Sequence, residues 1–316
     1  MNRHKLTVLM LGGARRVSMA ELLKESGRRL GYDVNIVSYE LISQVPIAAV
    51  ADVVVGLKWR DEGVVDDIIR VSREHEVSII LPFVDGAIEI ASILKQRMPD
   101  VFVPVSDFDV ARMMFDKVEA AKAFEAAGLP IPATYSVISA EVPAIAKPRH
   151  GSASRGIKIF YNIEDLMHLD NIDDYLIQEY IEKPFEFTVD CYVDQQGEIM
   201  VCVPRKRLEV MGGEVTRTQT CRIKQLDEMS RRVIKAFNLR GPVTLQYLLD
   251  RKHGRYLLME VNPRLGGGVI CSMYAGAPFA DYILNEALGI NLRPCDDWSD
   301  HTLMARYQKE VIFFDN

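Results

Sequence analysis

A short stretch of this sequence, LLMEVNPRLGGG at residues 257–268, carries a carboxylate, an amide and a guanidinium at alternating positions. Alternate residues of a β-strand share one face, so Glu260, Asn262 and Arg264 point the same way if the strand persists. Burying such a row is costly unless a partner satisfies its polar groups. Gln246, on the preceding predicted strand TLQYLLD, is expected to join the same patch.

Oxygen ligands of this kind suit Mg²⁺, which keeps several waters and is shared with substrate phosphates. The patch therefore predicts a metal site formed by Gln246, Glu260 and Asn262. Arg264 is left to hold the transferring phosphoryl group or an oxyanion. The three glycines after it, with Gly267 at their centre, are expected to leave room for a substrate close to Arg264.

A second candidate is the loop RHGSASRG at residues 149–156. Glycines and serines between two strands offer backbone N–H groups to phosphate oxygens; here they are Gly151, Ser152, Ser154 and Gly156. Lys147 ends the apolar run AIA just before the loop, and Lys117 begins a predicted helix of the same segment. Both lysines are expected to face the same anion. The alternatives are an exposed hairpin for the loop and solvated surface positions for the lysines.

Arginines cluster in PRKRLEV and in GGEVTRTQTCR, where they could hold substrate carboxylates bidentately. Strand alternation places Arg205 and Arg207 on one face, so we expect Arg205 to contact the substrate, with Arg207 and Arg217 behind it. Arg15 and Arg16 follow the first predicted strand, where open α/β sheets bind ligands. For each arginine a solvated strand edge is the alternative.

The composition describes an ordinary globular protein with sizeable cores: 48% of the 316 residues are hydrophobic and 26% are charged. The net charge of -6 gives no sign of a general nucleic-acid or anionic-membrane binder. No run of about 18 apolar residues predicts a membrane span. Five scattered cysteines without a CxxC pair favour a reducing compartment, so we expect a cytoplasmic protein.

The first hundred residues alternate apolar runs with helical patterns. The runs KLTVLML, DVNIVSY, ADVVVGL, VSIILPF and DVFVPV predict a parallel, doubly wound α/β sheet. The first run ends in LGGARR rather than GxGxxG, which argues against a dinucleotide fingerprint. Next come a predicted helix, FDKVEAAKAFEAAGLP, and the strand-like pieces IPATYSVI, PAIAKP and IKIFY. The second half is expected to be α+β, with strands EFTVDCYV, EIMVCVP and RYLLMEVN and helices over 227–238 and 277–288.

The order of these features along the chain resembles that of the ATP-grasp superfamily. The features are the two lysines, the Gly/Ser loop, the extended acidic stretch QEYIEKPFEFTVD at 178–190, the strand glutamine and the Glu-x-Asn-Pro-Arg motif. The similarity is greatest to the large chain of carbamoyl-phosphate synthase and its single-unit relatives. The resemblance implies a pre-ATP-grasp α/β domain over 1–106, a small lobe over 107–178, a large lobe with the metal site over 179–290, and a tail over 291–316.

The same resemblance implies roles for individual residues. Lys117 and Lys147 would contact the phosphates of ATP, and Lys147 and Arg264 would be catalytic. The adenine hinge would lie at Glu179, Tyr180 and Ile181, and Glu186 would hold the ribose. The cofactors implied are ATP and Mg²⁺ or Mn²⁺.

The reaction implied is that of a carboxylate–amine ligase, in which ATP activates a small-molecule carboxylate as an acyl phosphate that an amine or ammonia attacks. The resemblance also implies a homodimer and leaves open a separate amidotransferase that supplies ammonia. The alternatives are a carbamoyl-phosphate-synthase-like subunit that needs a partner, a small-molecule kinase, and an ATP-binding protein without catalysis. A protein kinase is disfavoured because no HRD or DFG motif follows AIAK.

Overall fold

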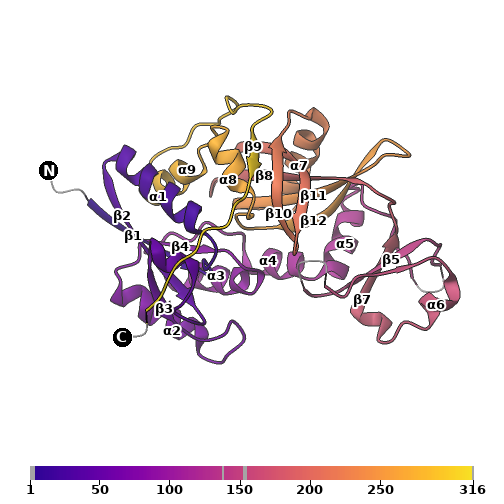
Figure 1. Cartoon of the computed structure of the whole chain (residues 1–316), viewed down its shortest axis with the longest axis horizontal. Coiled ribbons are helices and arrows are strands. Elements are labelled where there is room, and N and C mark those ends of the chain that lie inside the picture. Colours follow the sequence, from indigo (N-terminus) through magenta and orange to yellow (C-terminus); the bar gives the residue numbers. More distant parts are fainter. Residues whose placement is uncertain (1–3, 137–138, 152–154, 315–316) are drawn as a thin grey trace.

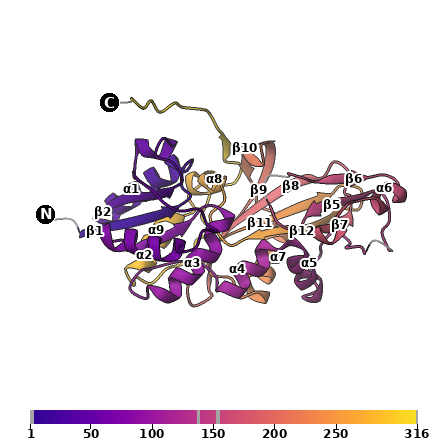
Figure 2. The same ribbon diagram turned by 90° about the horizontal axis from the view of Figure 1, so that it is seen from below.

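Three β-sheets follow one another along the length of the molecule in the computed structural model, which describes residues 4–136, 139–151 and 155–314 (Figure 1). The N-terminal sheet lies at one end and the small sheet of β5, β6 and β7 at the other. Figure 2 shows the same arrangement after a quarter turn. The large sheet lies between them, so it can form a site with either neighbour.

The N-terminal sheet is parallel, with strand order β3-β2-β1-β4. Helix α1 packs on one face and helices α2 and α3 on the other, which confirms the predicted doubly wound fold. The elements are β1 (His4–Leu11), α1 (Val17–Leu30), β2 (Tyr32–Glu40), the 3-10 turn η1 (Pro46–Ala49), β3 (Asp52–Val55), α2 (Val64–Glu74), β4 (Ile79–Pro82) and α3 (Asp85–Arg97).

The fifth apolar run, DVFVPV, does not form the predicted strand. Only Phe102 makes a parallel bridge, to Ile79, so the run merely extends the edge of the sheet. Pro104 in the middle of the run has no N–H group for a strand ladder, which explains the short pairing.

The helix predicted from FDKVEAAKAFEAAGLP, residues 115–130, is present as α5 (Lys117–Ala126), and a helix that was not predicted, α4 (Phe108–Phe115), comes just before it. Asp116 separates them because its side chain accepts hydrogen bonds from the backbone N–H groups of Val118 and Glu119. This is the geometry of a helix N-cap, which ends one helix and begins the next.

The small sheet is antiparallel, with order β6-β5-β7. Its apolar face, with Ala146 and Ile177, packs on Leu166 of α6. The elements are β5 (Ala144–Pro148), β6 (Lys158–Phe160), α6 (Ile163–Met167), the 3-10 turn η2 (Ile172–Asp174) and β7 (Tyr175–Glu179). IPATYSVI was expected to be strand-like, yet among its described residues only Thr134 makes an isolated bridge; residues 137 and 138 lie outside the described residues.

The large sheet has the order β12-β11-β8-β9-β10-β13, and all its pairings are antiparallel. The predicted helices at 227–238 and 277–288 are present as α7 and α9. The elements are β8 (Phe185–Val193), β9 (Ile199–Met211), β10 (Glu214–Thr220), α7 (Lys224–Ala236), β11 (Gly241–Asp250), β12 (Arg255–Asn262), α8 (Val269–Tyr274), α9 (Phe279–Ala287) and β13 (Leu303–Ala305).

Hydrophobic cores cross the predicted domain boundaries. Met10 of β1 and Leu23 of α1 share one core with Tyr192, Val203 and Phe279. On the other face of the large sheet, α4 and α5 pack with α7 in a second core. The division into 1–106, 107–178, 179–290 and 291–316 stays a prediction about folding units. Within the described ranges, no helix is both long and apolar enough to cross a membrane.

Candidate functional site

One face of the large sheet carries a row of polar side chains. Glu260 pairs in register with Gln246, Gln246 with Thr188, and Thr188 with Arg205. Directly paired residues of antiparallel strands point to the same face, so these side chains lie together. We call this row, with Asn262, the polar face. The opposite face is apolar and packs on α4, α5 and α7, which is why the polar side chains are all on one side.

The predicted metal ligands are brought together on the polar face. The side-chain amide of Asn262 donates to Glu260 Oε1 over 2.5 Å, and Gln246 lies directly across from Glu260. Within the part of the chain that the structure describes, no group of three or more His, Cys, Asp and Glu side chains could hold a metal ion. One carboxylate with two amide oxygens fits Mg²⁺ that completes its ligands with water and phosphate oxygens.

A β-bulge interrupts β12 beside this site. Gln246 pairs with Glu260, but Tyr247 pairs with Leu258, so Met259 is the extra residue on β12. Bulges re-aim side chains and are frequent beside active sites. The bulge lets Leu258 and Val261 both join the apolar core while Glu260 stays on the polar face.

Lys147 lies opposite the polar face, on the inner face of the small sheet. Its Nζ donates to Gln178 Oε1 at 2.9 Å, and only 8% of the residue is exposed. Burial lowers the pKa of Lys147 to about 8; the negative charge of Glu260 opposes this, and the positive charge of Lys117 adds to it. The charge of Glu260, a predicted metal ligand, therefore acts on Lys147, a predicted phosphate contact, although the two residues are far apart in sequence.

Lys117 contacts the Gly/Ser loop, as the sequence predicted for two groups that serve one anion. Its Nζ donates to the carbonyl of Gly151 at 2.6 Å, and its backbone N–H donates to the carbonyl of Arg149. Gly156 has φ +75° and an added Cβ would lie 2.9 Å from Pro148, so only glycine fits there. Ser152 and Ser154 lie outside the described residues.

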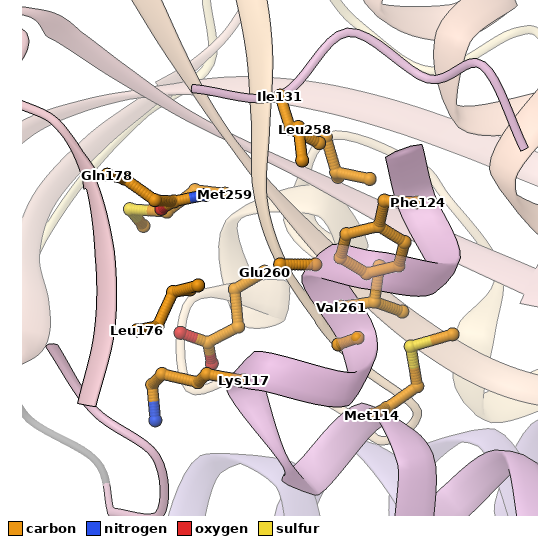
Figure 3. A pocket seen from close by; sticks show the side chains of 12 residues that line it. Met114, Lys117, Phe124, Ile131, Leu176, Gln178, Leu258, Met259, Glu260 and Val261 are labelled. Atoms are coloured by element: carbon orange, nitrogen blue, oxygen red, sulfur yellow. The ribbon is translucent and has the colours of Figure 1, made fainter. Parts of the chain in front are cut away.

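A pocket opens where the small sheet, α5 and β12 meet (Figure 3). Figure 3 shows the Glu260 carboxylate and the Lys117 side chain on the same side of it, with Gln178 and Met259 across the pocket. The other lining residues are mostly apolar: Met114, Ala120, Ala121, Phe124, Ile131, Leu176, Leu258 and Val261. The pocket thus places the charged groups of Lys117 and Glu260 beside an apolar wall.

The predicted adenine hinge connects the small and large sheets. The Glu179 carboxylate accepts from the backbone N–H of Ala133 at 2.9 Å and from Arg255 Nη2 at 2.6 Å. The Tyr180 N–H donates to the carbonyl of Pro143, and the side chain of Ile181 is buried. Glu179 thus holds the hinge in place with its side chain, while adenine binding at these residues stays a prediction.

Glu186, the predicted ribose contact, forms an ion pair with Arg207, a predicted substrate contact. Arg207 Nε donates to Glu186 Oε2 at 3.0 Å. Burial lowers the pKa of Arg207, and the charge of Glu186 opposes this. Arg217 is exposed on β10, in register with Glu209 and Ala305. The roles of these three side chains stay predictions.

Arg205, which we expected to contact the substrate, is 1% exposed and has partners within the protein. Its Nε and Nη2 donate to Asp190 at 2.6 and 3.1 Å, and its Nη1 donates to Thr218 Oγ1 at 3.0 Å. Ser272 of α8 completes the network by donating to Asp190 at 2.6 Å. Because Arg205 is fully buried and its donors are occupied by the protein itself, we do not include Arg205 in the proposed substrate site.

Arg264 does not continue the row of Glu260 and Asn262. Strand β12 ends at Asn262, and the Arg264 N–H turns back to the Asn262 carbonyl at 2.8 Å. Its Nε and Nη2 donate to Asp85 Oδ1 at 3.0 and 2.7 Å, at the start of α3. Arg264 therefore faces the N-terminal part of the chain, which the alternation of the strand did not predict.

The glycines after Arg264 make room for side chains of the protein itself. A Cβ on Gly267 would lie 2.8 Å from Arg16 Nη1, and one on Gly268 would lie 2.5 Å from Arg205 Nη1. We expected these glycines to leave room for a substrate close to Arg264, whereas in the structure arginine side chains from elsewhere in the chain lie against Gly267 and Gly268.

Several residues at this site escaped the sequence reasoning. Gln178, the partner of Lys147, is the first residue of the acidic stretch at 178–190, but the carboxylates of that stretch were the predicted ligands. Asp85, Glu214 and Arg306 had no motif around them. Their only signal is proximity, which arises from long-range packing and is invisible in a single sequence.

The comparisons with known proteins agree with this geometry. Residues 171–310 match the family model "ATP-grasp in the biosynthetic pathway with Ter operon". Mitochondrial pyruvate carboxylase of Mus musculus is 26% identical over 234 residues, which is 64% of this chain and 20% of that protein. The carbamoyl phosphate synthase large chain of Sulfurisphaera tokodaii is 27% identical over 192 residues, 52% of this chain and 18% of that one. The chain thus spans about a fifth of these relatives.

Solved structures share the fold over nearly the whole length. A biotin carboxylase complex from Campylobacter jejuni superposes with a TM-score of 0.74 at 19% identity, covering 93% of this chain and 73% of that one. N5-carboxyaminoimidazole synthetase from Staphylococcus aureus, in complex with ADP, gives 0.73 at 16% identity, covering 93% and 80%. The ATP-grasp family model thus matches residues 171–310 of this chain, and the solved structures share the fold of nearly the whole chain.

Proposed function

We propose that this protein is an ATP- and Mg²⁺-dependent ligase that activates a small-molecule carboxylate as an acyl phosphate for attack by an amine or ammonia. The observation that carries the proposal is that two lysines and a Gly/Ser loop lie close to a carboxylate that shares one sheet face with two amides. Lys117 and Glu260 line the same pocket, Lys117 donates to Gly151 of the loop, and the charges of Glu260 and Lys117 both act on Lys147. Cations with backbone donors suit a polyphosphate, and the oxygen ligands suit its metal.

The relatives give the proposal its reaction class. Their names include carboxylases, a carbamoyl phosphate synthase and a carboxyaminoimidazole synthetase. Each of these names describes a small acid-derived group that is joined to another molecule. Carboxylate activation by ATP accounts for this shared chemistry, and we extend it to the present chain.

The chemistry needs positioning and charge neutralisation more than a side-chain nucleophile. An oxygen of the substrate carboxylate attacks the γ-phosphorus, and the bond from that phosphorus to the bridging oxygen of ADP breaks. The amine lone pair then attacks the acyl carbon, inorganic phosphate leaves, and the amine proton passes to solvent. Lys117 and Lys147 neutralise phosphate oxygens, the loop at Gly151 and Gly156 donates N–H groups, and Arg264 holds the acid.

Mg²⁺ would be held by Glu260 and Asn262, with Gln246 beside them, and it would supply charge neutralisation at the phosphates. The carboxylate of Glu260 is the principal anionic ligand of this set. Gln246 and Asn262 contribute amide oxygens, which bind the ion less strongly. A site of low charge suits a metal that arrives together with the nucleotide.

The test is release of ADP and phosphate from Mg·ATP with a panel of acids, including bicarbonate and amino acids, with and without amines. Hydroxylamine is added to trap the acyl phosphate as a hydroxamate. A trapped hydroxamate identifies the acid and supports the ligase reaction. ATP binding without release or trapping for any acid would instead favour an ATP-binding subunit that needs a partner, the main alternative.

The proposal also covers the assembly and the location of the protein. A homodimer is one candidate arrangement, because a structurally similar biotin carboxylase domain is described as a dimer. A separate amidotransferase that supplies ammonia is another. We also keep a cytoplasmic location, because the five cysteines are scattered and the structure shows them as free thiols. Size-exclusion chromatography with light scattering measures the oligomeric state directly.

A further inference from the structure

Three arginines from distant parts of the sequence meet beyond the end of β12. Arg16 follows β1, Arg264 follows β12, and Arg306 follows β13. We call these three residues the arginine cluster. Arg264 is the member nearest to the proposed metal ligands along the chain, because it comes two residues after Asn262.

The arginine cluster already holds a carboxylate of the protein. Glu214, at the start of β10, accepts from Arg16 Nη2 at 3.1 Å through one oxygen and from Arg306 Nη1 at 2.7 Å through the other. Arg306 Nη2 also donates to the carbonyl of Gly267. Two guanidinium groups directed at one carboxylate form a geometry that suits carboxylates and phosphates in general.

The charges of the arginine cluster are not balanced by its partners. Glu214 and Asp85 supply two negative charges against three positive ones. The Arg16 side chain is only 15% exposed, and burial lowers its pKa; Glu214 opposes this, and the charges of Arg264 and Arg306 lower the pKa further. A partly buried excess of positive charge attracts an anion.

The backbone at Gly267 brings these cations close to the segment that follows the metal ligands. A Cβ at Gly267 would lie 2.8 Å from Arg16 Nη1 and 3.0 Å from Arg306 Nη2. The two guanidinium groups therefore reach the backbone three residues after Arg264. An acid bound by Arg264 would thus lie near the positive charges of Arg16 and Arg306.

We propose that the arginine cluster binds a second anionic group, a carboxylate or a phosphate, of the acid whose other carboxylate is activated. The substrate is then an acid with at least two anionic groups. This inference rests on the ligase proposed above and names its substrate class. Arg16 and Arg306 are specificity-determining residues in this scheme, because they act on the part of the acid that does not react.

The test compares acids that differ in one anionic group: succinate with butyrate, and 3-phosphoglycerate with glycerate. Binding to the Mg·ADP complex is measured by calorimetry, and acyl phosphate is trapped with hydroxylamine. We expect the dianion of a pair to bind better. We expect Arg16→Gln and Arg306→Gln to reduce its affinity roughly 10- to 100-fold, the usual effect of losing a charge-assisted hydrogen bond, with little change for the monoanion. If the preference is found for succinate over butyrate, the second anionic group is a carboxylate. If it is found for 3-phosphoglycerate over glycerate, the group is a phosphate.

The matched control is Arg28→Gln, because Arg28 is an exposed arginine of α1, the helix that begins directly after Arg16. It should leave both affinities unchanged. The inference is overturned if neither dianion binds better than its monoanion. It is also overturned if both arginine variants keep the preference for the dianion and only lower the melting temperature, which is the effect expected of Glu214→Gln. The arginine cluster would then have only a structural role.

The two proposals fail differently. Dianion binding that depends on Arg16 and Arg306 without any trapped hydroxamate would support the subsite and count against the ligase. Hydroxamate formed equally well from butyrate and succinate, in the wild type and in the variants, would support the ligase and overturn the subsite.

Discussion

Lys147 is a cation in a place where little water can solvate it. Its nearest polar partner is the neutral amide of Gln178 at 2.9 Å, and a second cation, Lys117, adds to the cost of its charge. Such a lysine gains more from a bound polyphosphate than an exposed lysine does, since the phosphate replaces water it has already lost. The buried position thus prepares the residue for an anionic ligand.

A pH dependence follows from this environment. Burial lowers the pKa of Lys147 to about 8, so the side chain is charged below that pH in the free protein and becomes neutral above it. We expect kcat/KM for ATP to fall as the pH rises through about 8. In Lys147→Met, activity should be low throughout and this pH dependence should be absent. A wild-type profile that stays level up to pH 10 would contradict the assignment of Lys147 to the phosphates.

Glu260 is the principal charged ligand proposed for the metal. Glu260→Gln should weaken the use of Mg·ATP by several orders of magnitude, because the remaining ligands are neutral amides that bind Mg²⁺ poorly. The far-UV circular dichroism spectrum should be unchanged. Glu182→Gln, at an exposed glutamate of the hinge region, is the matched control and should retain full activity. Near-normal turnover of the Glu260 variant at ordinary Mg²⁺ concentrations would disprove the metal assignment.

At the scale of elements, α8 is attached to the large sheet through a buried network. Arg205 of β9, Asp190 of β8 and Ser272 of α8 satisfy one another, with all three fully buried. Gly268 allows the start of α8 to lie directly on the guanidinium, because any Cβ would meet it. A satisfied buried polar network fixes the position of the elements that it joins.

Asp190→Asn should therefore be costly. It removes the charge that compensates Arg205, and we expect a loss of about 3–5 kcal/mol in the free energy of unfolding. Asp296→Asn removes the carboxylate of an exposed pair with Arg222 and should change stability by less than about 1 kcal/mol. Urea denaturation of the two variants measures both values. Equal effects would mean that the buried network has no special role.

At the scale of the whole molecule, the N-terminal sheet and the large sheet share one core. Phe279 of α9 packs edge-on against Tyr192 of β8, with ring centroids 6.5 Å apart, and lies in the same core as Leu23 of α1. Arg264 and Asp85 form an ion pair between the same two parts at 2.7 Å. A continuous core implies that the two parts unfold together.

Phe279→Ala tests this cooperativity. The side chain is 1% exposed, so its truncation should cost about 3–5 kcal/mol in the free energy of unfolding. Tryptophan fluorescence and far-UV circular dichroism should give coincident urea transitions in the wild type and coincident, shifted transitions in the variant. Two separate transitions in the wild type would show that the parts unfold independently.

The order of the motifs resembles that of the ATP-grasp superfamily, and the sequence by itself determined the doubly wound start of the chain and most strands of the large sheet. These features depend on local periodicity and on residue chemistry, and both are legible along one strand or helix. Glu260 and Asn262 on one face, and Lys117 beside the Gly/Ser loop, belong to the same class of prediction. Two local details depended on single residues. Asp116 caps α5 and separates it from α4, and Pro104 keeps DVFVPV from forming a strand.

The tertiary structure alone decided which charged groups meet. The bulge at Met259, the inward burial of Arg205 against Asp190, and the turn of Arg264 towards Asp85 all depend on partners far away in sequence. The meeting of Arg16 and Arg306 at Glu214 has the same origin. Charge pairing is short-ranged in space and unrestricted in sequence, so a pattern along the chain can identify the candidate arginines but not the anions that they face.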